Sequence, residues 1–434
     1  MIQLRRVPLA AAAHRLRSHS GALGLFLVLF AASCAGTTSA DVTAAGTEVP
    51  PTDADAAAPT TVAAGSATTV DLNDLRKCID SLSVEEKAGQ TLWVMTSTPA
   101  NVAEAAAAGR IGGVGALEDQ GSDIADQIKQ VTSGARVKMA VSSDEEGGLV
   151  QRLDKVLQPL PSARDTTETL STDQTAEMWS TYATDMAALG FNTNFAPVLD
   201  VGFGPALTSR SYGLDPAVVS DFAIAAMTGM NEGGITPIAK HFPGIGYADS
   251  DPHGQLVTVG GLDQLKQREF LPFQAAIEAG VPAIMTTHAV IPDVTGQEPV
   301  SMSPEGVALL RDDLDFKGLI VTDSLSMGAI ADSRSQPEAA VQALVAGNDV
   351  ALIAGAQNIE ASHAALVAAV ADGTISEDQL TESAQRVLSF KGITGPCPAG
   401  GSEPATPTTP VPASTQAPGT TVAQRDPLGG GQAG

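Results

Sequence analysis

The sequence predicts a single (β/α)8 barrel of the TIM type, flanked by a disordered N-terminal tether and a disordered C-terminal tail. Eight short apolar runs alternate with amphipathic stretches, as expected of parallel strands joined by helices. The globular part, residues 71–398, has a size that suits one such barrel. An open, doubly wound sheet is the alternative that this pattern leaves open.

The expected elements follow from the apolar pattern and from helix start signals. A capping box joins Ser83 to Glu86, and Ser303 precedes a proline at a helix start, two arrangements that open helices. The expected strands are 90–95, 112–117, 137–142, 194–201, 236–242, 283–288, 318–322 and 349–354. The clearest expected helices are 175–189, 216–232, 262–279, 304–312, 337–346 and 377–390.

Residues 1–33 have the features of an export signal. Four arginines precede an apolar stretch, 21–33, which is short for a membrane span but suits a signal peptide. The stretch runs into Ala-Ala-Ser-Cys34, which resembles a bacterial lipobox. We therefore expect an exported protein, lipid-anchored through Cys34 on the extracellular or periplasmic side of the cell membrane. Ordinary signal cleavage near the same place is the alternative.

Two segments lack the apolar residues that a core needs. Residues 34–70 and 399–434 consist mostly of small and polar residues and proline. Such compositions stay disordered because they cannot bury enough apolar surface. We expect the first to be a tether and the second to be a tail.

The composition narrows the class of partner. The formal net charge is −25 and no basic run occurs beyond the N-terminus, which argues against nucleic-acid binding. Only 4% of residues are aromatic, while alanine and glycine are abundant, which favours close helix packing. A domain of this length buries a full core by itself, so we expect a monomer.

Beyond Cys34, the cysteines are Cys78 and Cys397, near the two ends of the expected domain. In an oxidising compartment a disulfide between the first and last helices is plausible. Two unpaired thiols are the alternative, and the sequence does not decide between them.

Unusual polar residues follow five consecutive expected strands. They are Asp144, Asp200, Lys240 with His241, His288 and Asp323. Barrel enzymes build their sites at the carboxyl ends of strands, so this pattern predicts an active site.

Some of these residues have a structural alternative. His288 is expected to be a hydrogen-bonded core histidine rather than a catalytic one, and the structural alternative for Asp200 is to brace a loop or a neighbouring residue. His241 and His253 lack the spacing of known metal motifs, so we expect no metal and no other cofactor.

Five segments in order resemble the glycoside hydrolase family 3 β-N-acetylglucosaminidases of the NagZ group. The resemblance covers nearly all of 80–395. The segments are 144–152 (DEEGGLVQR, similar to D-Q-E-G-G-R-V-Q-R), 210–216 (RSYGLDP, similar to R-S-F…D-P), 240–246 (KHFPGIG, similar to K-H-F-P-G-H-G), 251–253 (DPH, similar to D-S-H) and 318–327 (GLIVTDSLSM, similar to the nucleophile segment).

The resemblance implies a role for each site residue. Asp323 is the implied nucleophile, a carboxylate that attacks the anomeric carbon to form a glycosyl-enzyme. His253 is the implied general acid/base, oriented by Asp251, because imidazole titrates near neutrality. The implied ligands of the sugar hydroxyls are Asp144, Arg210, Lys240 and His241.

Three positions depart from the family pattern. Ile245 replaces a histidine, Pro252 a serine and Leu149 an arginine. None removes a proposed catalytic group, but Pro252 should stiffen the turn that carries His253. The departures therefore bear on the motion of this loop and on the leaving-group side of the pocket more than on the type of reaction.

The implied activity is that of a retaining exo-β-N-acetylglucosaminidase acting on peptidoglycan fragments, at linkages of the GlcNAc-β-1,4-MurNAc type. One alternative is a phosphorylase, in which phosphate attacks the glycosyl-enzyme. A second is a non-catalytic sugar-binding lipoprotein, although such a protein has no need for Asp323, Asp251 and His253 together.

Overall fold

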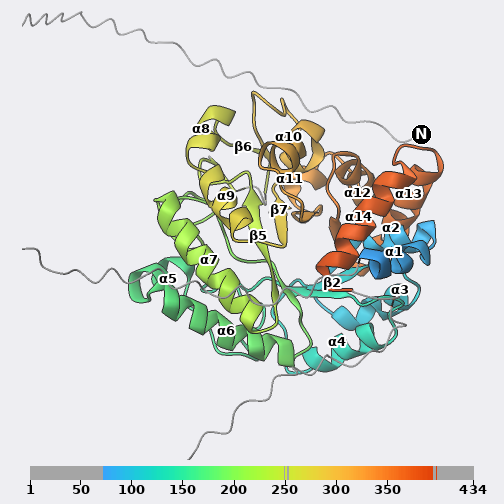
Figure 1. Cartoon of the computed structure of the whole chain (residues 1–434), viewed down its shortest axis with the longest axis horizontal. Coiled ribbons are helices and arrows are strands. Elements are labelled where there is room, and N and C mark those ends of the chain that lie inside the picture. Colours follow the sequence, from blue (N-terminus) through green and yellow to red (C-terminus); the bar gives the residue numbers. More distant parts are fainter. Residues whose placement is uncertain (1–71, 249, 252–253, 394–396, 398–434) are drawn as a thin grey trace, which may run out of the picture. The chain divides into compact units, whose positions relative to one another are not determined.

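The computed structural model describes residues 72–248, 250–251, 254–393 and 397. Within them a ring of strands is surrounded by helices (Figure 1). The predicted signal peptide, Cys34, the tether and the tail lie outside the described residues, as do Pro252 and His253.

Eight parallel strands form the barrel, hydrogen-bonded in the order β10-β1-β2-β3-β4-β5-β7-β9. Val321 of β9 bridges to Val350, next to β10, and the Thr322 N–H donates to the Val350 carbonyl at 3.0 Å. These contacts bring the sheet edges together into a nearly closed barrel, which excludes the doubly wound alternative. The strands are β1 (Leu92–Thr96), β2 (Gly113–Ala116), β3 (Ala140–Ser143), β4 (Thr193–Asn194), β5 (Thr236–Phe242), β7 (Ala283–Thr286), β9 (Leu319–Thr322) and β10 (Ala351–Ala354), with β6 (Val257–Thr258) and β8 (Ala289–Val290) in a separate pair.

Helices connect the strands and cover the outside of the barrel (Figure 1). None of the helices in the described part of the chain is long and apolar enough to cross a membrane. The α-helices are α1 (Leu72–Asp80), α2 (Val84–Gln90), α3 (Ala103–Ala107), α4 (Ile124–Ser133), α5 (Ala163–Thr169), α6 (Thr172–Ala188), α7 (Pro216–Glu232), α8 (Leu262–Gln267), α9 (Phe270–Glu278), α10 (Pro304–Ala308), α11 (Gly328–Ala331), α12 (Gln336–Val345), α13 (Ile359–Ala371) and α14 (Glu377–Phe390). Short turns are η1 (Pro99–Val102), η2 (Val300–Met302), η3 (Leu309–Asp313, a π-helical turn) and η4 (Ala356–Asn358).

Several expected elements match closely, and three differ. The expected strand 194–201 is wrong in length, because β4 ends at Asn194 and only Val198 makes a further bridge, to Lys240. Pro197 within this run has no N–H to give to a ladder. The expected helix 262–279 is two helices, α8 and α9, broken at Arg268, which leaves the helical region. The expected helix 304–312 is α10 followed by η3.

Small residues allow the close helix packing that the composition predicts. Gly229 of α7 faces α6 so closely that a Cβ there would lie 2.2 Å from the Ala176 carbonyl oxygen. Asp215 caps α7 by accepting the Ala217 N–H at 2.9 Å, and Pro216 occupies the first turn. The Asp-Pro pair in the 210–216 segment therefore starts a helix.

The first and last helices meet at the amino-terminal end of the barrel. α1 and α14 pack together (Figure 1), and Cys78 and Cys397 are joined by a disulfide. Of the two alternatives for these cysteines, the structure has the bonded one. Around it a small apolar cluster gathers Leu75, Ile79, Leu82, Val137, Leu388 and Ile393.

Candidate active site

Five of the predicted site residues lie at the carboxyl end of the barrel. Asp144 directly follows β3, and Lys240 and His241 belong to the last part of β5. Arg210 lies between β4 and α7, and Asp323 directly follows β9. Because all eight strands are parallel, these positions share one end of the barrel.

Four predicted residues form one charged cluster around a fifth, Glu146. The Lys240 ammonium forms ion pairs with Asp144 and, at 2.5 Å, with Glu146. The Arg210 guanidinium grips Glu146 at two points, with Nε–Oε2 at 2.6 Å and Nη2–Oε1 at 2.8 Å. Its Nη2 also lies 3.4 Å from His241 Nε2. Paired charges of this kind stay rigid because each group fixes its neighbours.

The charges of the cluster are mutually stabilised. Burial by itself lowers the pKa of Lys240, but the carboxylates of Asp144 and Glu146 outweigh burial and raise that pKa above its usual value. Burial disfavours the charged form of Glu146, yet Arg210 and Lys240 hold the pKa of its carboxyl well below the usual range. Lys240 and Glu146 are therefore both ionised at neutral pH.

Sequence reasoning missed Glu146, which is the centre of this cluster. Its side chain is 2% exposed, against 25% for Asp144. The neighbouring Glu145 is also buried and accepts hydrogen bonds from Ser143 at 2.5 Å and Tyr182 at 2.7 Å. Burial raises the pKa of Glu145. The three adjacent acids thus have different environments, and Asp144 is the most exposed to solvent.

Arg152 is a second residue that sequence reasoning missed. It ends the 144–152 segment, and its Nη2 lies 3.9 Å from Asp144 Oδ2. Its Nε is buried and has no hydrogen-bond partner among the described residues. A donor left unpaired beside a partly exposed carboxylate suits a polar ligand. The arginine within a motif already assigned to sugar binding was the available signal.

Asp200 connects β5 to the loop that follows it. It is fully buried, and its Oδ2 lies 2.7 Å from His241 Nδ1 while its Oδ1 accepts the Ile245 N–H at 2.8 Å. Since the Arg210 guanidinium only donates, His241 Nε2 accepts and Nδ1 carries the proton. Asp200 therefore braces the loop and orients His241.

The loop after β5 begins in close contact with the barrel. Gly244 has φ +109°, and a Cβ there would lie 2.6 Å from Glu269 Oε2. A Cβ on Gly246 would lie 1.8 Å from the Val201 carbonyl oxygen. The first glycine is needed for its backbone angle and both for close approach. Buried Ile245 fits this tight packing.

The proposed acid/base pair lies further along the same loop. Asp251 is exposed, and its carbonyl accepts the Gly254 N–H at 3.3 Å, which forms a turn. His253 lies outside the described residues.

Asp323 is held by backbone groups at both ends. Its N–H donates to the Thr286 carbonyl of β7 at 2.8 Å. Its carboxylate Oδ1 accepts the Ser324 N–H at 2.7 Å. The side chain is partly exposed, so it combines a fixed position with access to a ligand.

His288 is a core histidine, as the sequence favours. It is fully buried, with Nδ1 2.7 Å from Ser301 Oγ and Nε2 2.9 Å from the Ser324 carbonyl oxygen. No cluster of metal-binding side chains was found among the described residues.

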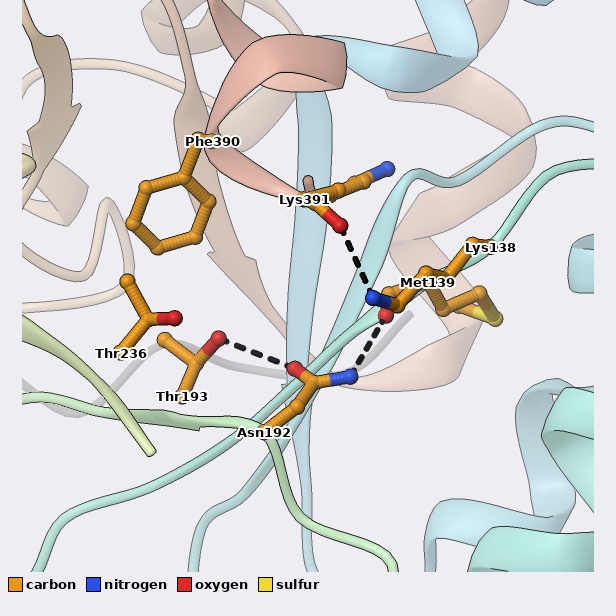
Figure 2. Close-up of a pocket in the computed structure, with 7 residues that line it drawn as sticks. All are labelled: Lys138, Met139, Asn192, Thr193, Thr236, Phe390 and Lys391. Carbon is orange, nitrogen blue, oxygen red and sulfur yellow. Dashed lines mark hydrogen bonds between the residues drawn. The ribbon is translucent and has the colours of Figure 1, made fainter. Parts of the chain in front are cut away.

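A small cavity of about 30 Å³ lies at the opposite end of the barrel (Figure 2). Lys138 Nζ donates to the Lys391 carbonyl at 2.9 Å, and buried Lys391 donates to Gln90 at 2.7 Å. Burial, followed by the Lys138 charge, lowers the pKa of Lys391 well below its usual value. The space is far too small for a sugar ring, so it is not a second candidate active site. Its lining is Lys138, Met139, Asn192, Thr193, Thr236, Phe390 and Lys391.

Comparison with known proteins agrees with this geometry. Residues 83–390 match the model of the glycosyl hydrolase family 3 N terminal domain. The chain is 32% identical over 356 residues to beta-hexosaminidase LpqI of Mycobacterium tuberculosis, covering 78% of this chain and 92% of that protein. It is 33% identical over 252 residues to a beta-hexosaminidase of Stenotrophomonas maltophilia, covering 56% and 75%.

Solved structures show the same fold. The structure of M. tuberculosis LpqI aligns with a TM-score of 0.71 at 31% identity, over 75% of this chain and 97% of that one. A beta-N-acetylhexosaminidase from Beutenbergia cavernae aligns with a TM-score of 0.68 at 29% identity, over 72% and 99%. A family 3 beta-N-acetylglucosaminidase from Paenibacillus gives 0.67 at 31% identity, over 72% and 62%.

Proposed function

The chain belongs to glycosyl hydrolase family 3, and from this membership and its site we propose that it is a retaining exo-β-N-acetylglucosaminidase. The reaction removes a terminal GlcNAc residue through a covalent glycosyl-enzyme. The names of its relatives, beta-hexosaminidase and beta-N-acetylglucosaminidase, support this substrate class.

The position of Asp323 carries the proposal. A partly exposed carboxylate with one oxygen fixed by the Ser324 N–H is suited to attack the anomeric carbon. The bond from that carbon to Asp323 forms as the glycosidic bond breaks, and the carboxylate also stabilises the positive charge that develops on the sugar ring.

Asp251 and His253 supply the proton transfers in this proposal. Protonated His253 gives its proton to the departing oxygen in the first step. In the second step it takes a proton from water, whose oxygen attacks the same carbon and releases Asp323. The Asp251 carboxylate, two residues earlier in the sequence, favours the protonated ring.

The charged cluster holds the sugar. Asp144 and Arg152 are its partly exposed members, with 25% and 27% of the side chain accessible, so they are the groups that reach the hydroxyls. Lys240, His241 and Arg210 are more buried. Their main part is to fix Asp144 and the floor of the pocket, while the Lys240 ammonium has a hydrogen left for a ligand.

We place the enzyme on the outer side of the cell membrane, held by a lipid on Cys34 and acting on peptidoglycan fragments with GlcNAc-β-1,4-MurNAc linkages. The support is the lipobox-like sequence before Cys34 and the tether after it. Labelling of the chain by a fatty acid in bacterial cells, lost in Cys34→Ala, is the test of the anchor.

The test of the activity is hydrolysis of a chromogenic β-N-acetylglucosaminide, with and without phosphate. We expect release of the chromophore by the wild type, with GlcNAc as the product in both conditions. GlcNAc-1-phosphate as the main product would indicate the phosphorylase instead. A folded wild type that is silent on β-glycosides in both conditions would leave the non-catalytic sugar-binding protein.

A further inference from the structure

The residues behind the nucleophile form a closed ring of hydrogen bonds. Starting from Asp323, the Ser324 N–H donates to the carboxylate, and the Ser324 carbonyl lies 2.9 Å from His288 Nε2. His288 Nδ1 contacts the Ser301 hydroxyl at 2.7 Å. Hydrogen bonds of Asn348 and Thr286 connect Ser301 back to the Asp323 N–H and close the network.

The return path is built from equally short contacts. Asn348 Nδ2 donates to the Ser301 carbonyl at 2.8 Å, and Asn348 Oδ1 accepts the Thr286 hydroxyl at 2.8 Å. The Thr286 carbonyl accepts the Asp323 N–H at 2.8 Å. His288, Ser301, Thr286 and Asn348 are all fully buried. Buried networks whose members are satisfied hold one arrangement.

The contacts of His288 define its tautomer. A carbonyl oxygen only accepts, so the bond to Ser324 requires the proton on Nε2. Nδ1 of the neutral ring is then an acceptor, and the Ser301 hydroxyl donates to it. The His288 imidazole has no accessible surface. It therefore cannot reach the leaving group of a substrate, and any effect on the reaction passes through its neighbours.

We propose that His288 is a positioning residue for the nucleophile, acting through the Ser324 carbonyl. This inference rests on the proposed function, in which Asp323 attacks the sugar. Fixing the Ser324 carbonyl fixes the residue whose N–H meets Asp323 Oδ1 at 2.7 Å. That contact directs the carboxylate that attacks the anomeric carbon.

Two substitutions of His288 separate its contact with the Ser324 carbonyl from its contact with the Ser301 hydroxyl. In His288→Gln the amide nitrogen reaches the place of Nε2 and preserves the donor to Ser324. In His288→Asn the shorter amide reaches only the place of Nδ1 and loses it. We expect His288→Gln, which loses only the Ser301 contact, to lower kcat no more than several-fold, and His288→Asn to lose about 10²-fold, the scale of a small misplacement of a reacting group.

The readouts distinguish positioning from folding. KM and the affinity for GlcNAc should stay near wild type in His288→Asn, because the sugar-binding residues Asp144, Arg152 and Lys240 belong to the loop after β3 and to β5. The rate at which a 5-fluoro β-N-acetylglucosaminyl fluoride labels Asp323 should fall with kcat. Equal kcat losses in the two variants, or a raised KM with unchanged kcat, would overturn the inference.

Ser301→Ala tests the inference even if His288→Asn does not fold. It removes the Nδ1 partner with little change in volume, so labelling of Asp323 should slow several-fold at unchanged GlcNAc affinity, and a wild-type rate would overturn the inference. An active Asp323→Ala variant would instead overturn the proposed function and this inference with it. A silent Asp323→Ala beside an unimpaired His288→Asn overturns the inference alone.

Discussion

Arg210 and Glu146 form a two-point ion pair, 2.6 and 2.8 Å long, at the carboxyl end of the barrel. The pair is nearly buried, with 13% and 2% of the side chains exposed. It joins the loop after β3 to the loop after β4, and Lys240 ties the same carboxylate to β5. The buried Glu146 carboxylate thus links residues that follow or end three consecutive strands, β3, β4 and β5. This arrangement positions the partly exposed Asp144 beside it.

Replacing that anion should cost both stability and activity. Glu146→Gln leaves buried Arg210 without its carboxylate and Lys240 with Asp144 alone, and removal of one partner from a buried pair costs about 3–5 kcal/mol. Urea denaturation measures this change. Lys155→Ala is the matched control, because Lys155 and Asp119 form an exposed pair worth less than about 1 kcal/mol. Equal losses in the two variants would contradict the central place of Glu146.

Glu269 should make stability depend on pH. Burial is the main cause that raises the pKa of its carboxyl to about 7, against the partial opposition of Arg268. A raised pKa means that the folded state holds the proton more tightly. The associated stability is therefore present below the unfolded pKa, near 4.5, and is lost as pH rises toward 7.

The measurement is the stability difference between wild type and Glu269→Gln from pH 4 to pH 8. Wild type should lose up to about 3 kcal/mol relative to the variant as pH rises through this window. Glu278→Gln, an exposed position at the end of the same helix, controls for the loss of a carboxylate. A difference that does not change with pH would show that folding does not raise the pKa of Glu269.

Gly246→Ala should disable the loop that carries the acid/base. The added methyl group would lie 1.8 Å from the Val201 carbonyl oxygen, so the backbone must move. A loss of about 1–3 kcal/mol is typical of overpacking, and kcat should fall because His253 follows seven residues later. Gly254→Ala is the control for the thermal melt, since a Cβ there meets nothing within 4 Å. Full activity in Gly246→Ala would contradict the packed loop base.

The disulfide should stabilise the barrel without affecting the chemistry. Cys78 and Cys397 are separated by 319 residues, and loss of such a cross-link costs about 2–5 kcal/mol. The double variant Cys78→Ala/Cys397→Ala should melt at a lower temperature, yet keep the wild-type KM below its transition. An unchanged melting temperature, or a KM that rises in the folded variant, would contradict this division.

The sequence predicted the barrel because each strand has a local signal. β5, α7 and α14 have the bounds that their patterns indicated. The errors arose where tertiary contacts decide. The run 194–201 is apolar throughout, but Pro197 interrupts its pairing. Arg268 and Glu269 continue a helical pattern, yet Arg268 leaves the helical region, and both side chains contact Val201 in another loop.

The sequence predicted which residues belong to the site better than it predicted which side chains pair with each other there. The resemblance selected Asp144, Arg210, Lys240 and His241, and the structure brings them together. Glu146 was missed because three adjacent acids look alike until the fold buries two of them. Arg210 and Glu146 are 64 residues apart and lie in different loops. No local sequence pattern predicts that these two side chains pair.

Covalent trapping tests the central claim most directly. The chain is incubated with a 5-fluoro β-N-acetylglucosaminyl fluoride, digested and analysed by mass spectrometry. We expect one sugar on the peptide that contains Asp323, and no label in Asp323→Ala, which should also fail to hydrolyse the chromogenic substrate. Turnover of that substrate by a wild type whose label lies on another residue, or by Asp323→Ala, would contradict the account.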